Sequence, residues 1–217
     1  MTTMNAVTQR AIANALLDSG AVGFSPEKPI TFKSGIRSPI YVDNRRLSYH
    51  PRAWRVVVEG FVSTIDTRAL DYDALAGVAL GGVAHCAALA YTVGKPAVIV
   101  RKESKRHGRG KRIEGGEVKG LRLLLIEDLV TTGGSSLSGV AALREAGATV
   151  ADVCAIVSYG FAAAAAAFAQ AGLRLHTLTN FETILQESQA RGRLDAAQLA
   201  ILRDWFADPY QWGREQA

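Results

Sequence analysis

The sequence predicts an α/β protein in which a central parallel β-sheet of about five strands is flanked by helices, with a small N-terminal region beside it. Short apolar runs alternate along the chain with helical stretches of about 10 to 15 residues, which is typical of parallel sheets covered on both faces. Of the 217 residues, 48% are hydrophobic, which is enough for one large core. We therefore expect one domain spanning residues 1–217.

The N-terminal region is predicted to begin with a helix over residues 5–17, which Gly20 ends because glycine favours the turn after a helix. The segment 29–47, PITFKSGIRSPIYVDNRRL, mixes short β-like runs with turn residues. Pro51 then begins a helix that reaches about Ile65, since proline is tolerated in a first helical turn. Residues 1–50 thus precede the sheet.

Strands and helices then alternate to the end of the chain. The strands are predicted at 74–80, 96–100, 121–127, 149–158 and 173–179. The helices are predicted at 83–93, 135–147, 161–171, 181–191 and 195–206. Because ligands of such sheets bind beyond the carboxyl ends of the strands, the segments that follow residues 100 and 127 are expected to share one rim.

The net charge of +5 is concentrated in one segment. RKESKRHGRGKR, at 101–112, holds seven Lys or Arg residues against one Glu, so the rest of the chain carries a net charge of −1. The wider segment 101–120 contains five glycines and few apolar residues, and we expect a flexible loop. It suits an anionic ligand, although a solvated basic loop or a nucleic-acid patch is an alternative.

The stretch EDLVTTGGSS, at 127–136, combines two carboxylates with a glycine and hydroxyl loop. Its glycines allow several backbone N–H groups to gather in one concavity, and the helix that follows points its positive end there. This suits a phosphate monoester. Glu127 and Asp128 would repel phosphate, and instead suit hydroxyl donors or Mg²⁺, so a ribose 5-phosphate satisfies both halves. The alternative is an ordinary strand end followed by a helix cap.

The run LLLIEDLVTTGGSS, at 123–136, resembles the signature of the type I phosphoribosyltransferases. The resemblance implies that Glu127 and Asp128 hold the ribose hydroxyls of phosphoribosyl pyrophosphate (PRPP) and that the following loop holds its 5-phosphate. That loop consists of Leu129, Val130, Thr131, Thr132, Gly133, Gly134 and Ser135.

Two further segments resemble the orotate phosphoribosyltransferases of that family. The basic segment is similar to their catalytic loop, which implies catalytic roles beside that of Asp128 and a homodimer in which loop 101–120 reaches the neighbouring active site. The residues concerned are Arg101, Lys102, Lys105 and His107. FKSGIRSPIYVDNR, at 32–45, is similar to their base-binding segment in the N-terminal hood, and assigns Lys33 to substrate or PRPP. An ordinary turn between edge strands is the alternative there.

The resemblance implies transfer of the 5-phosphoribosyl group from PRPP to orotate, with Mg²⁺ carried by PRPP and Asp128 as its candidate protein contact. Thr131 and Tyr159 are expected at the substrate. The chain departs from the family pattern at Gly81, where many members have lysine, and at Tyr159, where many have arginine. The rival functions are a phosphoribosyltransferase acting on a purine or uracil, and a PRPP-sensing regulator that binds nucleic acid.

Composition also bears on location and partners. No apolar run approaches the roughly 20 residues of a membrane-spanning helix, and we detect no secretory signal. Cys86 and Cys154 lack metal-ligand spacing and are expected to be reduced core thiols. We therefore expect a cytoplasmic protein without membrane or nucleic-acid partners.

Overall fold

The computed structural model describes residues 6–32, 35–102 and 112–212. Its centre is a six-stranded sheet in the order β10-β9-β8-β5-β6-β7. The strands are β5 (Ala74–Val78), β6 (Ala97–Val100), β7 (Ile113–Glu114), β8 (Arg122–Val130), β9 (Thr149–Ser158) and β10 (Arg174–Thr177). All neighbouring pairs are parallel except β6 with β7. The predicted parallel sheet is confirmed, and a short antiparallel strand extends it.

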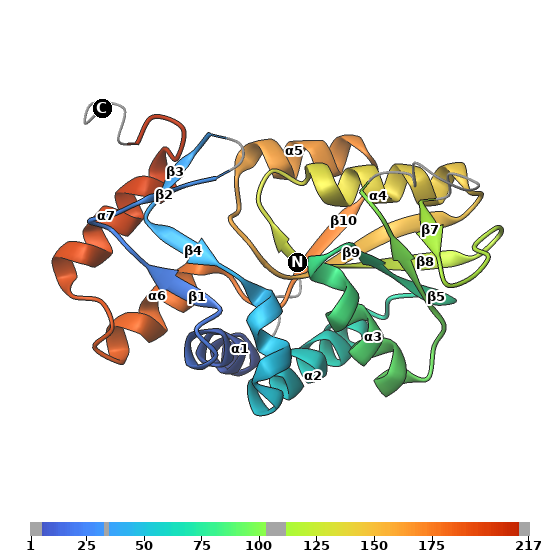
Figure 1. Cartoon of the computed structure of the whole chain (residues 1–217), viewed down its shortest axis with the longest axis horizontal. Coiled ribbons are helices and arrows are strands. Elements are labelled where there is room, and N and C mark those ends of the chain that lie inside the picture. The colour runs from blue at the N-terminus through green and yellow to red at the C-terminus, as the bar shows by residue number, and fades with distance from the viewer. Residues whose placement is uncertain (1–5, 33–34, 103–111, 213–217) are drawn as a thin grey trace.

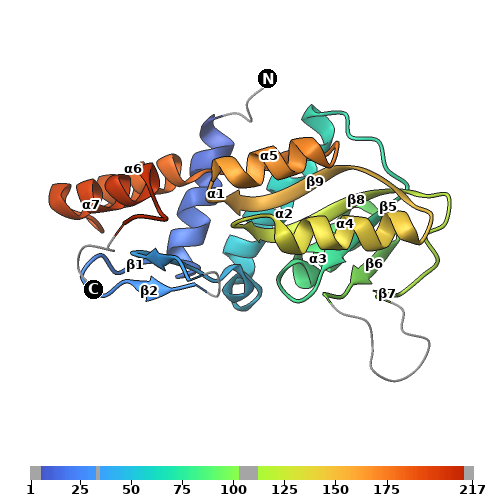
Figure 2. The same ribbon diagram turned by 90° about the horizontal axis from the view of Figure 1, so that it is seen from above.

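Helices cover both faces of this sheet. α2 (Pro51–Thr67) and α3 (Gly81–Val93) lie on one face, and α4 (Gly134–Glu145) and α5 (Ala162–Gln170) lie on the other (Figures 1 and 2). Side chains alternate along β8, so that Leu124 and Ile126 join the core under α2 and α3. Leu123 and Leu125 join the core under α4 and α5. This explains why the strand is apolar at successive positions.

The hood lies beside the sheet (Figure 1) and is built from both ends of the chain. Its elements are α1 (Ala6–Asp18), β1 (Val22–Phe24), β2 (Ile30–Thr31), β3 (Arg37–Ser38), β4 (Ile40–Val42), α6 (Phe181–Ala190) and α7 (Ala196–Ala207). The 3₁₀ helix η1 (Asn44–Tyr49) leads from the hood into α2. Trp205 of α7 is fully buried, and its Nε1 donates to the Arg37 carbonyl at 2.7 Å. The expectation of a purely N-terminal hood was therefore incomplete.

Two predicted boundaries were wrong. β8 was expected to end at Glu127 but continues to Val130, because its pairing with β9 extends to Val130↔Ser158, so Asp128 also lies within the strand and not beyond it. The loop expected over 101–120 is shorter, because Ile113 packs on the core as part of β7 and Val118 is buried. The flexibility of the remaining segment stays a prediction, since residues 103–111 lie outside the described residues.

Two smaller expectations can be compared with the structure. Cys86 and Cys154 are free and buried, as predicted. None of the helices in the described ranges has both the length and the apolar character needed to cross a membrane.

Candidate functional site

The strands that precede the basic segment and the glycine loop end at the same edge of the sheet. β6 and β8 both run parallel to β5, which lies between them, so their carboxyl ends share a rim. Arg112, at the base of the basic segment, donates from Nη2 to the Ser138 hydroxyl on α4 at 2.9 Å. The base of this segment therefore lies beside the helix that follows the glycine loop.

The glycine loop leads directly into α4. Gly133 is the N-cap residue with φ of 82°, and a Cβ added there would lie 2.7 Å from Phe168 Cε2. Both the backbone conformation and the available space therefore require glycine. Gly133 has no side chain with which to cap α4, which leaves the N–H groups of the first turn available to an anion. Thr131 is half-buried, whereas Thr132, Gly134 and Ser135 are exposed.

The two carboxylates of β8 differ in their surroundings. Glu127 is only 4% exposed, and its carboxylate accepts hydrogen bonds from the Ser136 hydroxyl at 3.1 Å and from the Asp128 amide at 3.2 Å. Burial, together with the neighbouring Asp128 charge, raises the pKa of Glu127 to about 8. Asp128 itself is half-buried. Burial and the Asp128 charge therefore both favour the protonated form of Glu127.

Gly81 lies directly against Asp128. A Cβ added at Gly81 would overlap the carboxylate of Asp128, so no side chain fits at this position while Asp128 keeps its orientation. The glycine that departs from the family pattern thus makes room for the carboxylate. The main chain of Asp128 is also held, because the buried Asn44 donates from Nδ2 to its carbonyl at 2.7 Å.

Tyr159 lies at the carboxyl end of β9 among aromatic side chains from several elements. Its ring stacks on Phe181 at a centroid distance of 4.6 Å and on Phe161 at 5.5 Å, and it also contacts Phe32. Burial raises the pKa of its hydroxyl, which has no hydrogen-bond partner within the described ranges. Phe32 directly precedes Lys33, which lies outside those ranges. The hood segment that follows β2 therefore contacts Tyr159, directly after β9.

The structure brings together only part of the predicted catalytic set. Arg101 lies at the stem of the basic segment, where its guanidinium pairs with Glu114 at 3.0 Å and its amide donates to the Arg112 carbonyl at 2.8 Å. Lys102 is exposed. Lys105 and His107 lie outside the described residues. Gly81 and Asn44 were missed as neighbours of Asp128, because their contacts join segments that are distant in the sequence.

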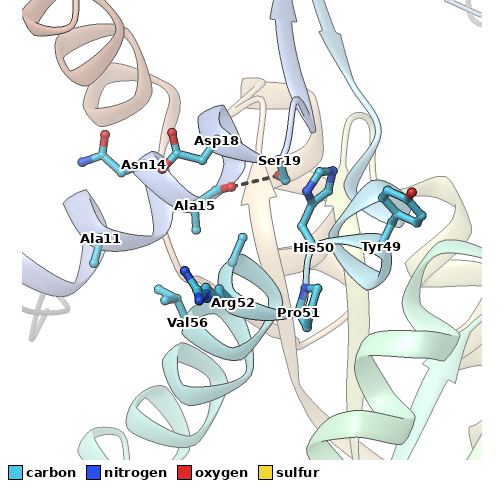
Figure 3. Close-up of a pocket in the computed structure, with 11 residues that line it drawn as sticks. Ala11, Asn14, Ala15, Asp18, Ser19, Tyr49, His50, Pro51, Arg52 and Val56 are labelled. Carbon is cyan, nitrogen blue, oxygen red and sulfur yellow. Dashed lines mark hydrogen bonds between the residues drawn. The ribbon is translucent and has the colours of Figure 1, made fainter.

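A separate cavity of about 580 Å³ opens between α1 and the beginning of α2 (Figure 3). Asp18, His50 and Arg52 are among the residues that line it. None of the residues predicted from the sequence for the site contributes to it. This cavity is therefore distinct from the rim described above.

Glu127 and Asp128 on β8 and the free first turn of α4 together suit a sugar phosphate as ligand. Residues 49–168, more than half of the chain, match the family model described as phosphoribosyl transferase domain. An orotate phosphoribosyltransferase of Bacillus caldolyticus is 41% identical over 202 residues, which cover 93% of this chain and 98% of that protein. The chain belongs to the orotate phosphoribosyltransferase family.

Other known proteins agree with this assignment. The orotate phosphoribosyltransferase of Cutibacterium acnes is 38% identical over 212 residues, covering 98% of each chain. The crystal structure of orotate phosphoribosyltransferase from Aeropyrum pernix superimposes with a TM-score of 0.73 at 31% identity, over 85% of this chain and 99% of that one. The Mycobacterium tuberculosis H37Rv enzyme in complex with PRPP gives a TM-score of 0.63 at 30% identity, over 81% of this chain and 98% of that one.

Proposed function

We propose that this chain transfers the 5-phosphoribosyl group of PRPP to orotate, giving orotidine 5′-phosphate and pyrophosphate. One observation carries the proposal. The acidic pair at the end of β8 continues through Gly133 into the uncapped first turn of α4, so hydroxyl acceptors and an anion site adjoin. A ribose 5-phosphate is the ligand that uses both.

In this proposal each part of the rim has one task. The first turn of α4, with Thr131 and Ser135, binds the 5-phosphate, while Glu127 and Asp128 accept hydrogen bonds from the ribose hydroxyls. The bond between C1 of the ribose and the pyrophosphate oxygen breaks, and positive charge develops on the sugar ring. Lys105 and His107 stabilise the departing oxyanion. N1 of orotate forms the new bond to C1 as the pyrophosphate leaves, and the proton on N1 passes to the departing pyrophosphate, since the negative charge of orotate is on its carboxylate.

The base is proposed to bind where the hood meets β9. Lys33 supplies a cation for the carboxylate of orotate. The hydroxyl of Tyr159, which has no hydrogen-bond partner among the described residues, would bind a polar atom of the ring. This part of the proposal is supported by the contact between Tyr159 and Phe32, which connects the end of β9 to the strand that precedes Lys33.

Mg²⁺ is proposed as the cofactor, bound chiefly by oxygens of PRPP. No group of three or more His, Cys, Asp or Glu side chains that could hold a metal occurs in the described ranges. The chemistry of Asp128 fits this role, because a half-buried carboxylate beside Gly81 can provide one hard oxygen ligand. When bound, the ion would neutralise pyrophosphate charge, and Asp128 would orient it relative to the ribose.

We also propose a homodimer in which the basic segment of one subunit completes the site of the other. Tyr49, Leu80 and Tyr91 are 86%, 74% and 92% exposed, an unusual exposure for large apolar side chains. Tyr49 ends η1, Leu80 directly precedes α3 and Tyr91 lies near its end, and η1 packs against α3. We propose that the three side chains share one face. A second copy of the chain would cover this face.

Mixing two inactive variants is expected to restore activity if sites are shared. In a heterodimer of Lys105→Ala and Asp128→Asn subunits, one site combines an intact Asp128 with an intact Lys105. Random mixing should therefore recover about a quarter of the wild-type activity. The control replaces the second subunit by one that carries both substitutions, which leaves no intact site. Recovery no greater than in this control would contradict shared sites.

Ultraviolet absorbance tests the reaction itself. Orotate consumption is followed with PRPP and Mg²⁺, and then uracil, hypoxanthine and adenine replace orotate. Turnover of orotate alone is expected. Turnover of another base would retain the PRPP site and reject the role of Lys33, whereas PRPP binding without any turnover would favour a regulatory protein.

We further propose a cytoplasmic location and no nucleic-acid partner, supported by the two free, buried cysteines and by a positive charge confined to one segment.

A further inference from the structure

Trp54, His85 and Asn44 form a polar trio behind Asp128 that has no part in the reaction described above. His85 and Asn44 are fully buried, and Trp54 is half-buried. Trp54 of α2 donates from Nε1 to Nδ1 of His85 on α3 at 3.0 Å, and the two rings meet edge to face at 78°. An indole nitrogen can only donate, so Nδ1 of His85 accepts. The proton of the neutral imidazole is therefore on Nε2.

The surroundings of His85 keep its ring neutral. The side chain is fully buried, and burial lowers its pKa more than the Asp128 charge and the Asn44 main chain raise it. α3, which carries His85, packs against η1, which begins at Asn44. His85 and Asn44 therefore form one buried layer between α2 and the end of β8.

Asn44 connects this layer to the acidic pair. The pairing of β5 with β8 ends at Gly77↔Ile126, so β5 gives no ladder partner to the following residues of β8. In that stretch the Asn44 amide donates to the Asp128 carbonyl at 2.7 Å. β9 pairs with this stretch on its other side as far as Val130↔Ser158, so Asn44 supplements the sheet on the side that β5 leaves open.

The trio is more polar than core packing requires. Within the described ranges, Nε2 of His85 and Oδ1 of Asn44 have no hydrogen-bond partner, although both side chains are fully buried. Nε2 of His85 carries a proton and can donate a hydrogen bond, whereas Oδ1 of Asn44 can only accept one. Buried polar groups without full pairing cost stability, and apolar residues of similar size would pack there at lower cost. A core role alone does not account for their presence.

We propose that Trp54, His85 and Asn44 are positioning residues for Asp128. Trp54 fixes the tautomer and the orientation of the imidazole, the imidazole supports Asn44, and Asn44 holds the main chain that carries the carboxylate. None of the three touches the reacting atoms. The proposal rests on the proposed function, because it assumes that Asp128 binds the ribose of PRPP.

The experiment compares PRPP affinity, kinetics and stability in one set of variants. Asn44→Ala and His85→Leu are expected to raise both the Kd and the KM for PRPP about tenfold, with a smaller change in kcat, since the ribose is held before and during the reaction. His85→Gln, which restores an N–H donor at the end of the side chain, should retain more affinity than His85→Leu. Calorimetry with PRPP and Mg²⁺ gives Kd independently of turnover.

Two further variants separate positioning from packing. Cys86→Ala removes buried volume from the same helix without changing a hydrogen bond, and is expected to lower the melting temperature while leaving Kd unchanged. Trp54→Phe keeps the ring contact but loses the N–H donor, and its effect should be less than additive with that of Asn44→Ala.

The outcomes are distinguishable. If Asn44→Ala and His85→Leu behave like Cys86→Ala, losing stability but not PRPP affinity, the trio is structural and the proposal is overturned. If the effects of Trp54→Phe and Asn44→Ala on the Kd for PRPP were additive, Trp54 would not act through Asn44, and that part of the proposal would be overturned. Failure of the wild-type protein to bind PRPP would instead overturn the proposed function on which this inference depends.

Discussion

Replacing Gly81 by alanine is expected to weaken PRPP binding about 100-fold while the protein stays folded. An added Cβ would occupy the space of the Asp128 carboxylate, which is the end of a side chain and can rotate away. The backbone of α3 does not have to move, and alanine is favoured over glycine in a helix. The loss is therefore functional, because the carboxylate leaves the position from which it would hold the ribose.

The adjacent glycine provides a matched control. A Cβ added at Gly82 would meet the carbonyl oxygen of Ile126 and lie 3.3 Å from the Cα of Glu127, both of which are main-chain atoms of β8. These atoms cannot rotate away, so Gly82→Ala is expected to cost about 1–3 kcal/mol of unfolding free energy. Calorimetry with PRPP and thermal unfolding would measure both variants. Wild-type PRPP affinity in Gly81→Ala would show that Asp128 does not bind the ribose in this orientation.

The affinity for PRPP is expected to rise with pH up to about 8 and then to level off. Below that pH the Glu127 carboxyl carries a proton, which has to be lost before both of its oxygens can accept hydrogen bonds from ribose hydroxyls. Each unit of pH below the pKa should therefore weaken binding about tenfold. Calorimetric titrations with PRPP at several pH values would measure how the affinity changes with pH. The phosphate and pyrophosphate groups of PRPP also titrate, and they contribute equally for every variant.

Glu127→Gln is the control for that slope. Its amide does not titrate in this range, so only the pH dependence of PRPP itself should remain, with weaker binding at high pH. The same shift has a consequence for the ligand-free protein. Since the folded-state pKa is raised from 4.5 to about 8, the folded state binds the proton more tightly, and this group makes the protein less stable as pH rises through that interval. If PRPP affinity changed with pH equally in the wild-type protein and in Glu127→Gln, the proton would belong to another group.

The parts of the fold that could be predicted are those with local signals. The alternation of apolar strands and helices predicted the parallel sheet, and the glycines after Thr132 predicted the turn into α4. The end of β8 was misplaced because Glu127 and Asp128 are polar, and only the pairing with β9 shows that the strand continues. The strand at Ile113 is too short for its two residues to show a pattern.

The surroundings of the acidic pair could not be predicted for a different reason. Gly81 and Asn44 reach Asp128 from α3 and η1, which are adjacent only in the folded chain. The aromatic cluster around Tyr159 combines side chains from the hood, β9, α6 and α7 in the same way. The sequence therefore indicated the glycine loop that leads into α4, but not the residues from distant segments that contact Asp128.

The shared construction of the hood also sets an order of events during synthesis on the ribosome. The central sheet and the helices on its faces are formed by the chain from α2 to β10, so they can assemble as soon as β10 has left the ribosome. The hairpin of β2 and β3, made among the first forty residues, has to wait for Trp205 before the Arg37 carbonyl gains its buried donor. The nascent chain would thus complete the rim that carries the acidic pair and the glycine loop first, and the hood last.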